Sequence, residues 1–173
     1  MAEPEFSRMV DSHKIDPKPL HIGANKAECA ALAKRFAIVA INRLEADVVL
    51  TADRDAVEVT GTLEAEIVQS CAVSGEDFPV AIHEPLSFRF VPERPLVPGE
   101  EEIELEEAEL DEIPFLGRSF DLGEAIAQSL ALAIDPYATG PNAEQARKQA
   151  GLLDEGAAGP FAALAALKDE KKG

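Results

Sequence analysis

The sequence has no tryptophan, and aromatic residues make up only 5% of it. Hydrophobic residues still account for 46% of the 173 positions, which is enough to build one domain with a core. Because several stretches are rich in proline, glycine, glutamate or alanine, we expect a compact middle with loose ends. We predict a single α+β domain over residues 1–140, with a flexible acidic loop over 92–113, and a flexible tail with short helices over 141–173.

Long apolar runs are missing, and cysteines are few. No segment approaches the length that crosses a bilayer, and Met1 to Val10 lack the apolar stretch of a signal peptide. We therefore expect a cytoplasmic protein that does not contact membranes. In that reducing compartment Cys29 and Cys71, the two cysteines, are expected to be free thiols.

Positive charge is also scarce. Sixteen lysines and arginines face 33 aspartates and glutamates, which gives a formal net charge of -17 and a pI near 4.5. This charge weighs against a protein that grips nucleic acid with its whole surface, because phosphates would repel it. It is typical either of a solvated surface that keeps the protein soluble or of a protein that attracts a basic partner.

The residue spacings that catalysis or metal binding requires are absent from the sequence. His13, His21 and His83 are scattered, and Cys71-Ala72-Val73-Ser74 has one cysteine where a zinc knuckle needs two. No glycine-rich phosphate loop precedes a helix, and no single pair of carboxylates stands out among so many. We predict no catalytic residue, no metal site, no cofactor and no small-molecule substrate, and hence no enzyme.

The strongest pattern is an alternation of apolar and polar residues. It runs from Val57 to Cys71 and resumes from Phe78 to Phe90, after a turn-forming cluster, and a shorter alternation covers 44–52. A period of two predicts antiparallel strands over 44–52, 57–70 and 78–91, buried on one face and solvated on the other. We expect a strongly curved, barrel-like sheet, extended by a strand within 5–10.

Glu84-Pro85 interrupts the third of these strands. Proline cannot donate a hydrogen bond to a neighbouring strand, so this point is expected to be a bulge or a sheet edge.

Two amphipathic helices are predicted to cover the sheet. Asn25 and Glu28 have capping-box spacing at the start of a helix that ends near Phe36. Asp121 and Glu124 have the same spacing at the start of a second helix, which ends at 135 and is apolar enough to be largely buried. Shorter helices are expected over 142–149 and 160–168.

A run of glutamates follows the sheet and has two interpretations. It is either a solvated loop or a docking strip for a basic partner, with a short edge strand around Ile103 and Leu105. The candidate partner-binding residues are Glu100, Glu101, Glu102, Glu104, Glu106 and Glu107, with Phe161 and Leu164 of the tail. In the competing interpretation, RNA is contacted by Arg43, Arg89, Arg94 and Arg118.

Several blocks of the sequence, taken together, resemble the YceD family of large ribosomal RNA subunit accumulation proteins, most closely its short acidic members from alphaproteobacteria. The blocks are Gly61-Thr62-Leu63-Glu64-Ala65, Gln69 to Ser74, Glu84-Pro85-Leu86, Phe120 to Glu124, Leu130-Ala131-Leu132 and Gly159 to Leu164. Many family members carry a C-x-x-C at the first cysteine block. This sequence has Ser74 in place of the second cysteine, so zinc is not expected here.

The resemblance implies a cytoplasmic factor needed for normal accumulation of 23S ribosomal RNA and for assembly of the large subunit. Combined with the negative charge, it favours a non-enzymatic protein that holds or delivers a basic large-subunit ribosomal protein. One alternative is a module that binds precursor 23S RNA directly. Another is a generic acidic adaptor for protein interactions.

Overall fold

The computed structural model describes residues 4–93 and 111–151. Contacts within the chain divide them into two units, one of residues 4–68, 79–93 and 111–134, the other of 69–78 and 135–151. The predicted helix over 160–168, the edge strand around Ile103 and most of the predicted acidic loop lie outside the described residues. The predicted division into a domain over 1–140 and a tail from 141 stays a prediction.

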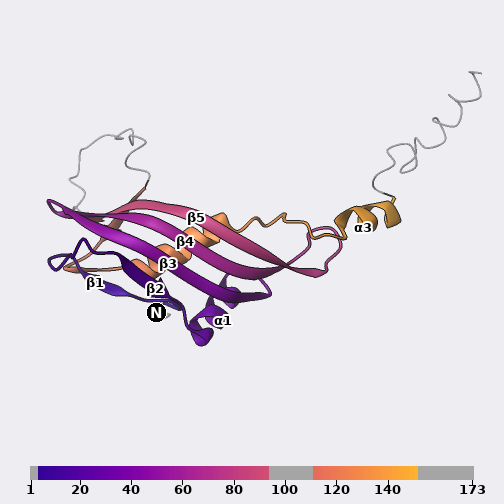
Figure 1. Ribbon diagram of the computed structural model, residues 1–173, viewed down its shortest axis with the longest axis horizontal. Coiled ribbons are helices and arrows are strands. Elements are labelled where there is room, and N and C mark those ends of the chain that lie inside the picture. The colour runs from indigo at the N-terminus through magenta and orange to yellow at the C-terminus, as the bar shows by residue number, and fades with distance from the viewer. Residues whose placement is uncertain (1–3, 94–110, 152–173) are drawn as a thin grey trace, which may run out of the picture. The chain divides into compact units, whose positions relative to one another are not determined.

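In the part of the chain that the structure describes, the main sheet has five strands in the order β2-β3-β4-β5-β6, and Figure 1 shows the first four side by side. The strands are β2 (Leu20–Gly23), β3 (Ala40–Asp53), β4 (Ala56–Ser70), β5 (Asp77–Pro92) and β6 (Glu112–Phe115). β3, β4 and β5 confirm the three predicted strands, although β3 begins four residues earlier than expected. The α+β class is confirmed as well.

Two features of the predicted sheet are wrong. Over 4–93 and 111–151 the sheet is open, with β2 and β6 at its two edges, so it is not a closed barrel. It is also mixed, because β3 is antiparallel to both β2 and β4 whereas β6 is parallel to β5. The connection between β5 and β6 is long, as parallel pairing requires.

The N-terminal strand does not extend this sheet, contrary to expectation. It is β1 (Met9–Asp11), and it pairs antiparallel with β7 (Ser119–Asp121) in a separate two-stranded sheet. Val10 pairs with Phe120, a fully buried ring that stacks on Phe90 with centroids 4.0 Å apart. The aromatic contact therefore joins the small sheet to β5.

The prediction of a sheet edge at Glu84-Pro85 is confirmed. β6 pairs only with Arg89–Pro92, so among the described residues β5 is an edge strand at Pro85. The Arg89 N–H donates to the Asp111 carbonyl beside β6. Pro85 lies four positions earlier, and backbone groups alternate in direction along a strand, so its missing N–H belongs on this open side.

The described residues contain three helices: α1 (Lys26–Arg35), α2 (Leu122–Ala133) and α3 (Ala143–Gln149). α1 begins with the predicted capping box, in which the Asn25 side chain accepts from the Glu28 N–H and the Glu28 carboxylate accepts from the Asn25 N–H. The Asp121 carboxylate caps α2 by accepting from the Glu124 N–H. All three helices agree with the predicted ranges to within two residues.

The core of the first unit lies between the helices and one face of the sheet. Alternate residues of the long strands are buried there, among them Leu44, Val48, Val59 and Leu63. Buried side chains of α1 and α2 belong to the same apolar cluster, which confirms that the two helices cover the sheet. The opposite face of β3 and β4, called the outer face below, is left to polar side chains.

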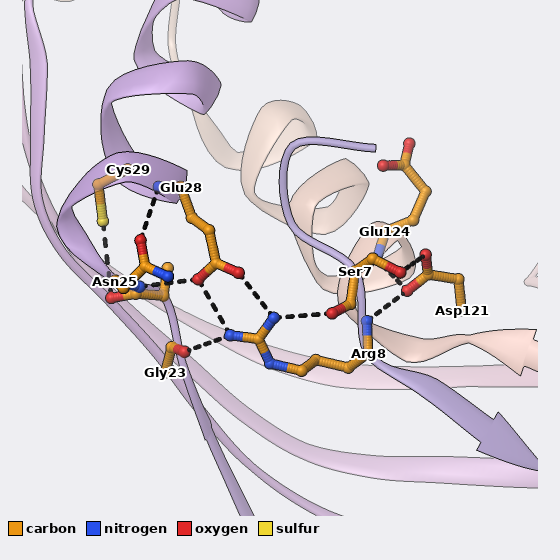
Figure 2. Close-up of polar contacts among 9 residues, drawn as sticks. Ser7, Arg8, Gly23, Asn25, Glu28, Cys29, Asp121 and Glu124 are labelled. Atoms are coloured by element: carbon orange, nitrogen blue, oxygen red, sulfur yellow. Dashed lines mark hydrogen bonds and ion pairs between the residues drawn. The ribbon is translucent and has the colours of Figure 1, made fainter. Parts of the chain in front are cut away.

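The segment before β1 ties the two helix starts together (Figure 2). The Ser7 hydroxyl and the Arg8 N–H both donate to the Asp121 carboxylate, at 2.6 and 2.8 Å. The Arg8 guanidinium donates to both carboxylate oxygens of Glu28 and to the Gly23 carbonyl. One short stretch thus bonds to both helix caps, and the fully buried ring of Phe6 anchors it.

Candidate functional site

The outer face of β3 and β4 is rich in carboxylates. Because side chains alternate across a strand, most buried residues of β3 and β4 are flanked by residues that point outward. The acidic ones are Glu45, Asp47, Asp53, Glu58, Glu64 and Glu66. Arg43 is the guanidinium that these two strands contribute to this face, so the face is acidic overall.

Arg43 sits among three of these carboxylates. Its guanidinium donates to Glu45 at 2.9 Å, to Glu66 at 3.2 Å and to Glu64 at 3.3 Å. Glu45 and Glu64 lie directly opposite each other on neighbouring strands, a placement of like charges that repels. Arg43 reduces this repulsion, and its three partners hold the pKa of the guanidinium above its ordinary value.

Two histidines extend the acidic region. The His21 Nδ1 lies 2.8 Å from a carboxylate oxygen of Asp47, and His83 Nδ1 lies 3.5 Å from Glu64. The hydrogen bond to Asp47 raises the pKa of His21, because the carboxylate favours the protonated ring. This end of the face therefore becomes less acidic when the pH falls through that pKa.

Two arginines of the RNA interpretation, Arg43 and Arg89, lie far apart. Arg89 pairs with Asp53 at 2.7 Å, and Asp53 lies ten positions from Arg43 along β3. At the rise of an extended strand this separation is about 33 Å. Arg118 lies in the turn after β6 and pairs with Asp11 at 3.1 Å, while Arg94 is outside the described residues.

The predicted partner-binding residues cannot be placed. Glu100, Glu101, Glu102, Glu104, Glu106 and Glu107, and Phe161 and Leu164, all lie outside the described residues. The acidic outer face was missed as a candidate site. Its signal in the sequence is the alternating Glu58, Glu64 and Glu66, a pattern that is equally typical of the solvated side of any strand.

The second unit is built around Cys71. Its thiol accepts hydrogen bonds from the N–H groups of Val73 and Ser74, both at 3.4 Å. Hydrogen bonds from the Ser74 hydroxyl and N–H, and then from other backbone N–H groups, lower the pKa of the Cys71 thiol to about 6. Burial has the opposite effect on Cys29 and raises its pKa.

The Cys71 turn does not fit zinc, because it offers one thiol as a ligand. A second thiol would be needed where the Ser74 hydroxyl donates to Cys71. In residues 4–93 and 111–151 no group of three or more His, Cys, Asp or Glu side chains is placed to hold a metal ion. Over the same ranges, the helices are all too short or too polar to span a bilayer.

Comparison with known proteins gives one family. The family model described as large ribosomal RNA subunit accumulation protein YceD matches residues 59–168, which is more than half of the chain. Searches of curated proteins and of solved structures found no significant match. The matched range holds most of β4 and all of β5, β6, β7 and α2. This chain therefore belongs to the YceD family of large ribosomal RNA subunit accumulation proteins.

Proposed function

We propose that this chain is a non-enzymatic ribosome biogenesis factor that acts in the cytoplasm, where it supports 23S rRNA accumulation and large-subunit assembly by binding a basic ribosomal protein. Family membership supports the ribosomal role. The observation that carries the binding mode is the acidic outer face, on which exposed carboxylates of two long strands outnumber the cations between them. Such a surface attracts a basic protein and repels the phosphates of RNA.

The outer face supports this role through geometry as well as charge. β3 and β4 are 14 and 15 residues long, so their carboxylates form a broad, fixed surface. Asp47 is 72% exposed and Glu66 is 54% exposed, so their oxygens remain available to a partner. A rigid display of exposed charge accelerates encounter with an oppositely charged protein, and salt screens the effect.

Direct RNA binding is the competing function. No observation favours it, because Arg43, Arg89 and Arg118 each contact carboxylates of this chain. A generic acidic adaptor, the third class, would leave 23S rRNA levels unchanged when the gene is deleted.

The first experiment is a cross-linked affinity purification from growing cells, analysed for protein and for RNA, with and without nuclease. We expect basic large-subunit proteins to remain bound after nuclease. Loss of those proteins together with direct cross-links to precursor 23S RNA would overturn the proposal in favour of the RNA-binding module.

A charge-reversal pair then tests the outer face. Asp47→Lys with Glu58→Lys should slow association with the captured protein and weaken the dependence of its association rate on salt. The matched control is Asp16→Lys with Glu144→Lys, which changes the net charge equally at exposed positions that belong to neither β3 nor β4. Equal effects of the two pairs would show that only total charge matters.

The run of glutamates over 100–107, called the acidic strip, and the tail with Phe161 and Leu164 are proposed as additional contacts. Reversing charges among Glu100 to Glu107 should slow association further, and Phe161→Ala with Leu164→Ala should speed dissociation. Binding kinetics that stay unchanged in these variants would remove the strip and the tail from the interface.

A further inference from the structure

A groove lies beside β5, on the side of the sheet that carries the helices. Its volume is about 520 Å³, and it is bounded by β5 residues 84–88, by Asp111 to Ile113 and by one side of α2. The α2 side chains at its wall include Ser129, Leu132 and Ala133. Leu132 is 89% exposed, although it stands on a helix whose other apolar residues are mostly buried.

The open edge of β5 forms one wall of this groove. β6 pairs with Arg89–Pro92 only, so within the described residues no strand pairs with the outward backbone groups of 83–87 on that side. The Arg89 N–H points toward β6, and the backbone groups of every second residue in a strand point to the same side. Ser87, two positions earlier, therefore presents its N–H and C=O to the groove. An unpaired strand edge next to an apolar helix side is the geometry of β-strand addition.

The charge of the groove indicates which segment would fit. The lining residues include the carboxylates of Glu84, Asp111 and Glu112, and no lysine or arginine is among them. The Glu112 carboxylate also forms an ion pair with the Arg89 guanidinium, at 3.7 Å. The stretch of this chain before Asp111 carries Glu104, Glu106, Glu107 and Glu109, which the groove carboxylates would repel.

We propose that the groove, called the β5 groove here, binds an extended basic segment of the partner protein as an added strand on β5. Apolar side chains of the segment pack on Leu132 and the small residues of α2, and its lysines or arginines meet Glu84 and Asp111. The inference rests on the proposed function for the basic character of the partner. Its recognition element, the strand edge, is separate from the outer face.

The proposal is tested with the full-length chain and a fluorescein-labelled peptide of alternating lysine and valine, followed by fluorescence anisotropy. The peptide should bind, whereas a peptide with glutamate in place of lysine, and one with N-methylated valines that cannot form strand pairs, should bind at least about tenfold more weakly. Equal binding of the three peptides, or no binding of the first, would overturn the proposal.

Two variants locate the peptide. Leu132→Lys removes the exposed apolar contact and adds a repelling charge, and it should weaken binding about tenfold. The matched control Leu116→Lys changes an equally apolar side chain that is 77% exposed in a turn outside the groove, and it should have little effect. Ser87→Pro removes an N–H that faces the groove and should also weaken binding. Equal losses in Leu132→Lys and Leu116→Lys would contradict the placement.

The two proposals can fail separately. If the captured ribosomal protein still binds the Leu132→Lys and Ser87→Pro variants with unchanged affinity but loses affinity for the outer-face pair, the β5 groove is excluded and the proposed function remains. If no basic protein is captured by the wild-type chain, the proposed function fails whatever the peptide does.

Discussion

The guanidinium of Arg8 and the carboxylate of Glu28 form a two-pronged ion pair, with N–O distances of 2.8 and 3.0 Å. Glu28 also accepts from the Asn25 N–H, so one carboxylate closes the capping box of α1 and holds the N-terminal segment (Figure 2). The hydrogen bond from Arg8 is the largest cause of the lowered pKa of Glu28. The pair therefore couples the start of α1 to the segment that caps α2.

Arg8→Ala should lower the free energy of unfolding by about 1–2 kcal/mol, since it leaves a partly buried carboxylate without its cation. Because the pKa of Glu28 is lowered in the folded protein, this contribution is present above the unfolded pKa and is lost as the pH falls through the folded one. Urea unfolding of wild type and variant at neutral and at acidic pH measures the loss of stability and its dependence on pH. Arg118→Ala, which removes a side chain that is 63% exposed from its ion pair with Asp11, is the control and should cost less.

Gly123→Ala should destabilise the protein by about 2 kcal/mol, although alanine normally favours a helix over glycine. An added Cβ would lie 2.6 Å from the Phe6 carbonyl oxygen and 2.8 Å from the Arg8 nitrogen. Gly23→Ala is the matched control, since its nearest neighbour would be 3.9 Å away. A melting temperature of Gly123→Ala equal to or above that of the wild type would show that the N-terminal segment does not pack there.

Arg43→Gln should lower the free energy of unfolding only slightly, because the side chain is 39% exposed and solvent screens its ion pairs. The loss arises from the opposed carboxylates of Glu45 and Glu64, and it should shrink in 1 M salt, where the Debye length is about 3 Å. Urea unfolding at low and high salt gives the comparison. Lys148→Gln, an exposed lysine on α3, should be neutral at both.

Asp47→Asn should lower the pKa of His21 toward its ordinary value. In the folded protein the carboxylate raises this pKa, so the stabilising contribution is complete below the unfolded pKa and is lost as the pH rises through the folded one. Titration of the His21 ring signals by NMR measures the shift directly. If the His21 titration curves of wild type and Asp47→Asn coincide, the hydrogen bond is absent in solution.

Cys71→Ser should reduce stability more at pH 8 than at pH 5. The pKa of the Cys71 thiol is lowered from 9.0 to about 6, so the thiolate contributes stability above its unfolded pKa, and this contribution is lost as the pH falls through about 6. The difference in melting temperature between wild type and variant is measured across this range. Cys29→Ser, whose thiol has a raised pKa, should show no such decline towards acid pH.

The elements with a repeating local pattern were predictable from the sequence. The three long strands follow from apolar residues at every second position, and both covering helices follow from a cap and a glutamate three residues later. The four short strands lack enough residues for a period to show. β2 and β6 are strands because of what they pair with, and pairing is a property of the whole fold.

The candidate site was predictable only in part. The carboxylates of the outer face could be read from the alternation of β4, but their cation could not. Arg43 lies opposite Glu66 because the register shifts between Ile41 and Arg43, and no local pattern marks that shift. The run of glutamates over 100–107 stands out in the sequence by its composition. Composition alone does not show where a segment lies in the fold.

The bond from Ser7 to Asp121 has a consequence for synthesis of the chain, because 114 positions separate the two residues. A ribosome releases the amino end of a protein first, and domains fold as they emerge. Ser7 and Phe6 therefore leave the exit tunnel long before α2 and its capping aspartate exist. During that interval the Ser7 hydroxyl lacks its acceptor, although Arg8 can already meet Glu28, and this part of the core can close only after α2 has emerged.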